Sequence, residues 1–172
     1  YKSITANSLG IGFGETWSFN KKIINQFNGY LLDYMGIPLP RYRGGAHFSW
    51  MIMQNEKNNG ACLQLINEDM IQGIYDSGEI LLEIKFKNNP NWNVNDYFNK
   101  QTLIAKKLII KFLKIINTTD IKGKKINEDN SFYLPRLNTK NNGWINWYIW
   151  NTQEIIRFVS AFGDPYDGAS SM

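Results

Sequence analysis

The pattern of apolar and polar positions along the chain predicts an α/β fold. Leu31, Leu32, Tyr34 and Met35 form a short apolar run that is interrupted only by Asp33, as in a strand buried on both faces. Other apolar runs predict strands over residues 8–13, 61–66 and 80–86. Residues 58–60, Asn-Asn-Gly, predict a turn before the second of these.

Apolar residues at helical spacing predict four helices between and after these strands. They cover residues 20–27, 46–54, 96–116 and 152–162, and Thr152 is the expected N-cap of the last. In the helix over 96–116 we expect an inward-facing apolar stripe, with lysines on the opposite face. The stripe comprises Phe98, Leu103, Ile104, Leu108, Phe112, Leu113 and Ile116. Residues 118–131 are polar and lysine-rich, which predicts a flexible, solvated loop.

Composition narrows the class of protein and of site. A chain of 172 residues with 15% aromatic residues is expected to form one domain over 1–172 with a substantial core. The single cysteine, Cys62, excludes an intrachain disulfide and a cysteine-rich metal site, and no metal is expected. No apolar run reaches the length of a membrane span, so we expect a cytoplasmic protein without a membrane partner.

The net charge of +4 comes mainly from scattered lysines, which we interpret as a solvated surface. The densest group lacks interleaved aromatic residues, so a nucleic-acid partner is not expected. This group comprises Lys106, Lys107, Lys111, Lys114, Lys122, Lys124 and Lys125.

Candidate chemistry begins with Asp33, because burying a carboxylate inside an apolar strand is energetically costly unless the carboxylate is partnered. Asp33 and Met35 leave the strand on one face near its C-terminal end, where open parallel sheets place ligands. Alternatively, the Asp33 carboxylate ties down the turn that follows the strand. His47 is the only histidine, and it is either a half-exposed helix residue or a group near the site. The glycines at 10, 12 and 14 lack the spacing of a dinucleotide fingerprint and no Gly-Lys-Ser/Thr follows them.

Several segments together resemble the folate-dependent formyltransferases, a family that includes the methionyl-tRNA and sugar N-formyltransferases. The stretch LLDYMGIPLPRYRGG is similar to the family's active-site segment, in which Asn-x-His at a strand end precedes a loop LPxYRG. Residues of the loop match without gaps at Leu39, Pro40, Tyr42, Arg43 and Gly44. Asp76, in YDSGEI, matches the family's third catalytic position, and RFVSAFGDPYDGA near the end is similar to its IRAxxxPYPGA segment. Asp33-Tyr34-Met35 stands where the family has Asn-x-His, and residues 87–131 match nothing in the family.

The resemblance implies a partial Rossmann-like formyltransferase domain, with a mixed sheet covered by helices and without the N-terminal half. We therefore expect the chain to be a fragment, or a trimmed product. A sheet without its first half exposes an edge strand that must be covered, so a homodimer is expected.

The resemblance also implies a site and its ligands. Its catalytic positions are Asp76, Asp33 and Met35, and the folate would lie against Trp17, Phe19, Gly73 and Tyr75. The substrate loop would comprise Pro40, Arg41, Tyr42, Arg43, Gly44 and His47. The co-substrate would be 10-formyltetrahydrofolate, and the acceptor a small-molecule amine, with a nucleotide-linked amino sugar favoured over methionyl-tRNA.

Two kinds of function stay open at this stage. In an enzyme, Asp76 would take a proton from the amine, while Asp33 and Asp76 could share a proton so that the protonated partner donates to an oxyanion. An ionised Asp33 offers no hydrogen-bond donor, however, and Met35 cannot do the chemistry of imidazole. The alternative is therefore a non-catalytic relative, a pseudoenzyme that binds or acts as a scaffold. A folate-dependent deformylase would depend on the same triad.

Overall fold

A mixed sheet forms the centre of the molecule. The computed structural model describes residues 8–14, 18–117 and 122–172, and within them four strands pair in the order β1-β2-β4-β5. They are β1 (Gly10–Gly12), β2 (Leu31–Met35), β4 (Asn58–Leu65) and β5 (Ile80–Lys87). β1 runs parallel to β2, whereas β4 is antiparallel to both β2 and β5. The predicted α/β class, with a mixed sheet and covering helices, is confirmed.

The register of β2 and β4 decides which side chains share a face of the sheet. Tyr34 lies opposite Leu63, whereas Asp33 lies opposite Gln64 and Met35 opposite Cys62. Tyr34 and Leu63 belong to the apolar cluster beneath α3 (Val94–Ile115). Because successive side chains of a strand alternate between faces, Asp33 and Met35 lie on the face away from α3. The strand pattern therefore directs both candidate residues to the same side of the sheet.

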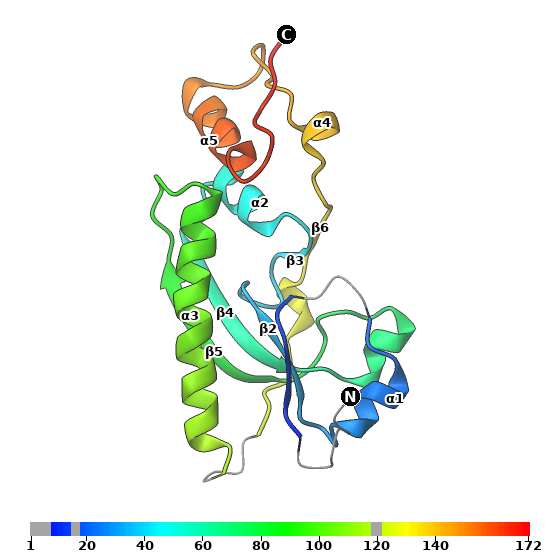
Figure 1. Cartoon of the computed structure of the whole chain (residues 1–172). Helices are drawn as coiled ribbons and strands as arrows, with labels where there is room; N and C mark the ends of the chain where they lie inside the picture. The colour runs from blue at the N-terminus through cyan, green and yellow to red at the C-terminus, as the bar shows by residue number, and fades with distance from the viewer. Residues whose placement is uncertain (1–7, 15–17, 118–121) are drawn as a thin grey trace.

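Helix α3 covers one face of the sheet along its length (Figure 1). A capping box between Asn93 and Asp96 begins the helix, and Ile104, Leu108 and Phe112 pack onto the sheet. The Tyr34 hydroxyl donates to the Gln101 side chain at 2.5 Å, which satisfies two buried polar groups at the helix–sheet junction.

The C-terminal third of the chain packs beside the sheet, against α2 (Figure 1). Helix α2 (His47–Met53) lies on α5 (Thr152–Phe162), and the buried Ser49 hydroxyl donates to the Ala161 carbonyl at 2.7 Å. β3 (Arg43–Gly44) pairs with β6 (Tyr133–Leu134) in parallel. The remaining elements are α1 (Lys21–Gln26), α4 (Thr139–Asn142) and two 3₁₀ turns, η1 (Glu68–Gln72) and η2 (Glu128–Asn130).

Three local expectations are corrected by the structure. Residues 58–60 are not a turn but the start of β4, because Asn58–Gly60 pairs with β5. The N-cap of α5 is Asn151 rather than Thr152, since the Asn151 side chain accepts the Glu154 N–H. Within 122–131, the described part of the predicted flexible loop, Lys124 pairs with Ile80 and Glu128 binds Arg43.

The third correction concerns α3. Phe98, Leu103 and Leu113 were expected on its inward face, but all three are exposed. Ile104, Leu108 and Phe112 are buried as expected, and Ala105 joins them. Among the described residues, no helix has the length and apolar character that crossing a bilayer would require.

Candidate functional site

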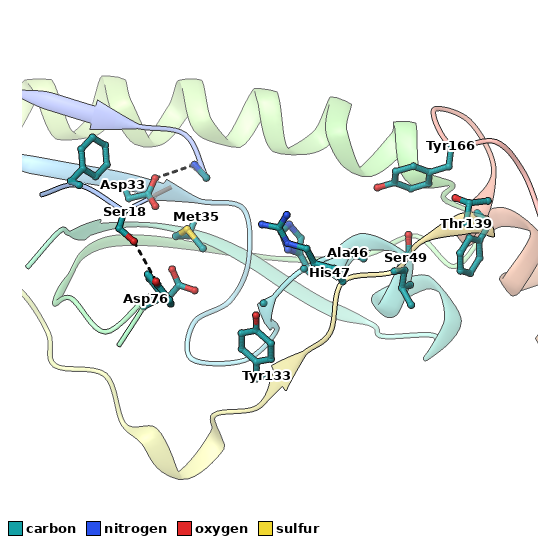
Figure 2. A pocket seen from close by; sticks show the side chains of 18 residues that line it. Ser18, Asp33, Met35, Ala46, His47, Ser49, Asp76, Tyr133, Thr139 and Tyr166 are labelled. Atoms are coloured by element: carbon teal, nitrogen blue, oxygen red, sulfur yellow. Dashed lines mark hydrogen bonds between the residues drawn. The ribbon is translucent and has the colours of Figure 1, made fainter. Parts of the chain in front are cut away.

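A cavity of about 570 Å³ lies between the sheet face that carries Asp33 and the C-terminal third of the chain. Figure 2 shows Asp33, Met35 and Asp76 gathered at one end, with His47, Thr139 and Tyr166 farther along it. Its described lining comprises Gly14, Ser18, Phe19, Asp33, Met35, Gly44, Gly45, Ala46, His47, Ser49, Tyr75, Asp76, Tyr133, Arg136, Leu137, Thr139, Phe162 and Tyr166. Segments from both halves of the sequence thus meet in one cavity.

Asp33 holds the backbone that follows β1. Its side chain is buried, and Oδ1 accepts the Gly14 N–H at 3.0 Å (Figure 2). This bond ties the carboxylate to the backbone after β1 rather than to the turn after its own strand, where one sequence interpretation expected it, and Asp33 also lines the cavity. In this contact the Asp33 Oδ1 atom is an acceptor.

Asp76 is held by two groups from other strands. Arg43 Nη2 donates to the Asp76 carbonyl at 2.7 Å, which fixes a residue whose φ is 55°, a conformation uncommon for a residue with a side chain. Burial raises the pKa of the Asp76 carboxyl, whereas the charge of Arg43 and a hydrogen bond from the Gln64 side chain oppose this rise. The result is a carboxyl group whose pKa lies above its ordinary value, as in many proton acceptors of active sites.

His47 lies on the same cavity at the start of α2. Its Nδ1 atom is enclosed and has no hydrogen-bond partner among the described residues. Burial lowers the pKa of the imidazole to about 4, so the ring is neutral at physiological pH. His47 is partly exposed at the start of α2, as one sequence interpretation expected, and it also lines the cavity, as the other expected.

The thiol of Cys62 is unsuited to nucleophilic chemistry, and the described residues offer no cluster of metal ligands. Cys62 is buried beside Met35, and burial, together with the charges of Asp33, Glu83 and Asp76, raises the pKa of its thiol to about 12. A thiol with such a pKa is neutral and inert. No group of three or more potential metal ligands occurs among the described residues.

The other predicted residues divide between this cavity and elsewhere. Phe19, Tyr75 and Gly44 line the cavity, and the Ser18 hydroxyl lies 3.3 Å from that of Tyr75. Gly73 is exposed and does not line it, and Trp17 lies outside the described residues.

Of the substrate loop, only its C-terminal part reaches the cavity. Pro40 and Arg41 line a second cavity of about 680 Å³ at β5. Tyr42 is fully buried, with its hydroxyl donating to Glu56 at 2.7 Å. Arg43 acts through Asp76, as described above. The loop is thus a structural support that ends at the cavity with Gly44.

The sequence did not predict that the residues at the far end of the cavity come together. Tyr133, Arg136 and Thr139 reach it from the segment around β6 and α4, and Tyr166 comes from the PYDGA segment. The Arg136 side chain packs directly against Gly45, so that a Cβ atom at position 45 would lie 2.3 Å from Arg136 Cγ. Arg136 has no ion pair or hydrogen bond to the residues that the structure describes. The sequence signals for this end are the glycine pair that follows Arg43 and the PYDGA segment.

Comparison with known proteins shows which sequences this chain resembles. No family model matches the chain. It is 30% identical over 101 residues to the methionyl-tRNA formyltransferase of Prochlorococcus marinus, and 28% identical over 133 residues to that of Kosmotoga olearia. The chain is a relative of the folate-dependent formyltransferases. These alignments cover 59% and 77% of the formyltransferase-like chain. They cover only 27% and 40% of the two relatives.

Solved structures share the formyltransferase fold. HypX from Aquifex aeolicus, in complex with tetrahydrofolic acid, matches 94% of this chain and 26% of its own with a TM-score of 0.75 at 21% identity. An N-formyltransferase from Helicobacter canadensis, in complex with folinic acid and dTDP-3-aminofucose, matches 81% of this chain and 50% of its own. The TM-score of that match is 0.68, at 24% identity.

Proposed function

We propose that this formyltransferase-like chain carries the reaction centre for transfer of a formyl group from 10-formyltetrahydrofolate to the amine of a nucleotide-linked amino sugar. The observation that carries the proposal is the hydrogen bond from Arg43 to the Asp76 carbonyl. It joins the LPxYRG loop to the segment with the candidate proton acceptor, at one cavity.

A folate would lie at the end of the cavity that carries the carboxylates. Phe19 and Tyr75 offer aromatic surface there, and a cavity of about 570 Å³ has a size common for small-molecule sites. A bound 10-formyltetrahydrofolate would supply the one-carbon unit. The solved relatives with tetrahydrofolic acid and with folinic acid support this assignment.

Asp76 would act as the base. An amine that becomes acylated loses a proton, and Asp76 can accept it because its carboxyl group is ionised above its raised pKa. Arg43 fixes the backbone at Asp76 and so holds the carboxylate towards the cavity. A fixed acceptor lowers the cost of orienting the reacting groups.

The acceptor would extend from the two carboxylates towards Arg136. The carboxylates suit an ammonium group, and the guanidinium of Arg136 suits a phosphate. Thr139 and Tyr166 place hydroxyl groups at the same end of the cavity. An amine and a phosphate within one small molecule, as in a nucleotide-linked amino sugar, would match both ends.

A second candidate is a non-catalytic binding protein with the same pocket. Met35 offers no proton-transfer group, and Asp33 Oδ1 accepts a backbone N–H instead of donating to a substrate. Losing one oxyanion donor costs about 10²–10³ in rate. Binding without measurable turnover would therefore identify this second function.

The test combines binding with turnover. Calorimetry should detect folinic acid binding, and a dTDP-linked amino sugar should be formylated from 10-formyltetrahydrofolate in a reaction that Asp76→Asn abolishes. Arg136→Ala should weaken binding of the sugar nucleotide but not of folinic acid. Lys140→Ala is the matched control, since Lys140 is an exposed cation on α4 outside the cavity. If neither ligand binds, both functions are wrong.

We also propose that the chain forms a homodimer. Among the described residues β1 pairs with β2 alone, and an open edge strand is a surface on which another chain can pair. Light scattering should give the mass of two chains at working concentration, and the mass of one chain would contradict the proposal.

A further inference from the structure

The outer face of α3 combines exposed aliphatic side chains with lysines. Leu103, Ile110 and Leu113 are 59%, 43% and 52% exposed. Lys106, Lys107 and Lys111 are exposed on the same helix, and none of the three forms an ion pair with a described residue. This face is independent of the cavity, because no residue of α3 lines it.

Helical geometry arranges these side chains in two adjoining stripes. At 3.6 residues per turn, Leu103, Lys106, Ile110 and Leu113 form one stripe, and Lys107, Lys111 and Lys114 form the next. Asp96 is the only acidic residue within α3, and its side chain is held in the N-terminal capping box. The face is therefore both apolar and uniformly basic.

The exposed aliphatic side chains and lysines of α3 fit an anionic bilayer better than a nucleic acid. A nucleic acid would engage the lysines but would leave three aliphatic side chains against phosphate or water, with no aromatic ring on these stripes for a base to stack on. A bilayer with anionic headgroups accommodates both features, because lysines meet the headgroups while the aliphatic groups enter the acyl boundary.

We propose that the outer face of α3 binds the surface of an anionic lipid bilayer. The helix would lie in the plane of the interface without crossing the bilayer, in agreement with the absence of a spanning helix among the described residues. The proposal departs from the sequence-based expectation of no membrane partner. That expectation rested on the lack of an apolar run of membrane-spanning length. The helix prediction separately placed Leu103 and Leu113 on the inward face, whereas the structure exposes both.

Co-sedimentation of the full chain with vesicles tests the proposal. Vesicles of phosphatidylcholine alone are compared with vesicles that also contain phosphatidylglycerol. The chain should sediment with the anionic vesicles only, and high salt should release it. Lys107→Gln with Lys111→Gln should weaken binding roughly tenfold or more, and Leu103→Gln with Ile110→Gln should weaken it as well.

The matched control is Lys85→Gln with Lys87→Gln. Both lysines are exposed and line the second cavity. They lie on the sheet face away from α3, because Ile84 and Phe86 of the same strand pack with α3 on the other face. This pair removes the same charge from the opposite sheet face and should leave binding unchanged. Equal losses in the two lysine pairs, equal binding to neutral vesicles, or binding to duplex RNA without vesicle binding would each overturn the proposal. Circular dichroism confirms that each variant is folded.

Discussion

Arg43 Nη2 donates to the Asp76 carbonyl at 2.7 Å, across 33 residues of sequence. The same guanidinium binds Glu128 at 2.6 Å and the Ser131 hydroxyl at 2.9 Å. One side chain therefore joins the loop after β2, the segment before β5 and the segment before β6. The position of the Asp76 carboxyl group in the cavity depends on this junction.

Replacing Arg43 by Lys should destabilise the fold, because one ammonium cannot reproduce the several directed contacts of a guanidinium. We expect the free energy of unfolding to fall by roughly 1–3 kcal/mol, the cost of leaving hydrogen-bonded partners unsatisfied. Urea unfolding measures the change. Arg41→Lys is the control, because the Arg41 side chain is 41% exposed, against 13% for Arg43. Equal losses for the two variants would contradict this role for Arg43.

Asp76→Asn should stabilise the chain at neutral pH while abolishing formyl transfer. Burial raises the pKa of Asp76 above its ordinary 3.8, so the folded state retains a proton that the unfolded state has already released. Stability therefore falls as pH rises from 3.8 through the raised pKa, and the full cost persists at higher pH. Urea unfolding at several pH values should show the variant more stable at neutral pH, with the difference closing towards pH 3.8. A variant less stable at neutral pH would contradict the raised pKa.

His47 should make the fold sensitive to mild acid. Its pKa is about 4 in the folded state, against 6.5 ordinarily, so the unfolded state binds a proton that the folded state does not. The stability linked to His47 is complete above pH 6.5 and falls as pH declines towards 4, by up to roughly 3 kcal/mol. His47→Gln should show a correspondingly weaker loss of unfolding free energy between neutral pH and about pH 4.5. Parallel pH profiles of parent and variant would disprove the shift.

Asp33→Asn together with Met35→His should raise the rate of formyl transfer by about 10²-fold or more, because the pair restores an N–H donor and an imidazole. The new amide would keep an oxygen for the Gly14 N–H, which now binds Asp33 Oδ1, so the turn after β1 should survive. The single variants are the controls in a single-turnover assay. If folinic acid binds and the double variant gains nothing, the pocket lacks more than those two side chains.

Sequence patterns were sufficient for the carboxylate end of the site. The two-residue period of a strand placed Asp33 and Met35 on one face. The resemblance placed the loop with Arg43 near Asp76, and in the structure Arg43 donates to the carbonyl of Asp76, which lines the cavity. Gln64 was missed because its place opposite Asp33 depends on the register between two strands. Neither strand's own apolar pattern contains that register.

The arrangement of residues at the far end of the cavity and the outer face of α3 could not be predicted, for a different reason. Arg136 reaches the cavity because Gly45 leaves room for its side chain, a tertiary contact across 91 residues that no local pattern reports. In α3, apolar residues occupy more than one side of the helix, so spacing alone could not decide which stripe faces the sheet.

A crystal structure of the chain with folinic acid and a dTDP-linked amino sugar tests the central claim most directly. The account predicts electron density for the folate and for the sugar amine beside Asp76, with a phosphate of the nucleotide at Arg136. Ligands bound only at the second cavity near Pro40 and Arg41, or no density beside Asp76 at saturating concentrations, would contradict it.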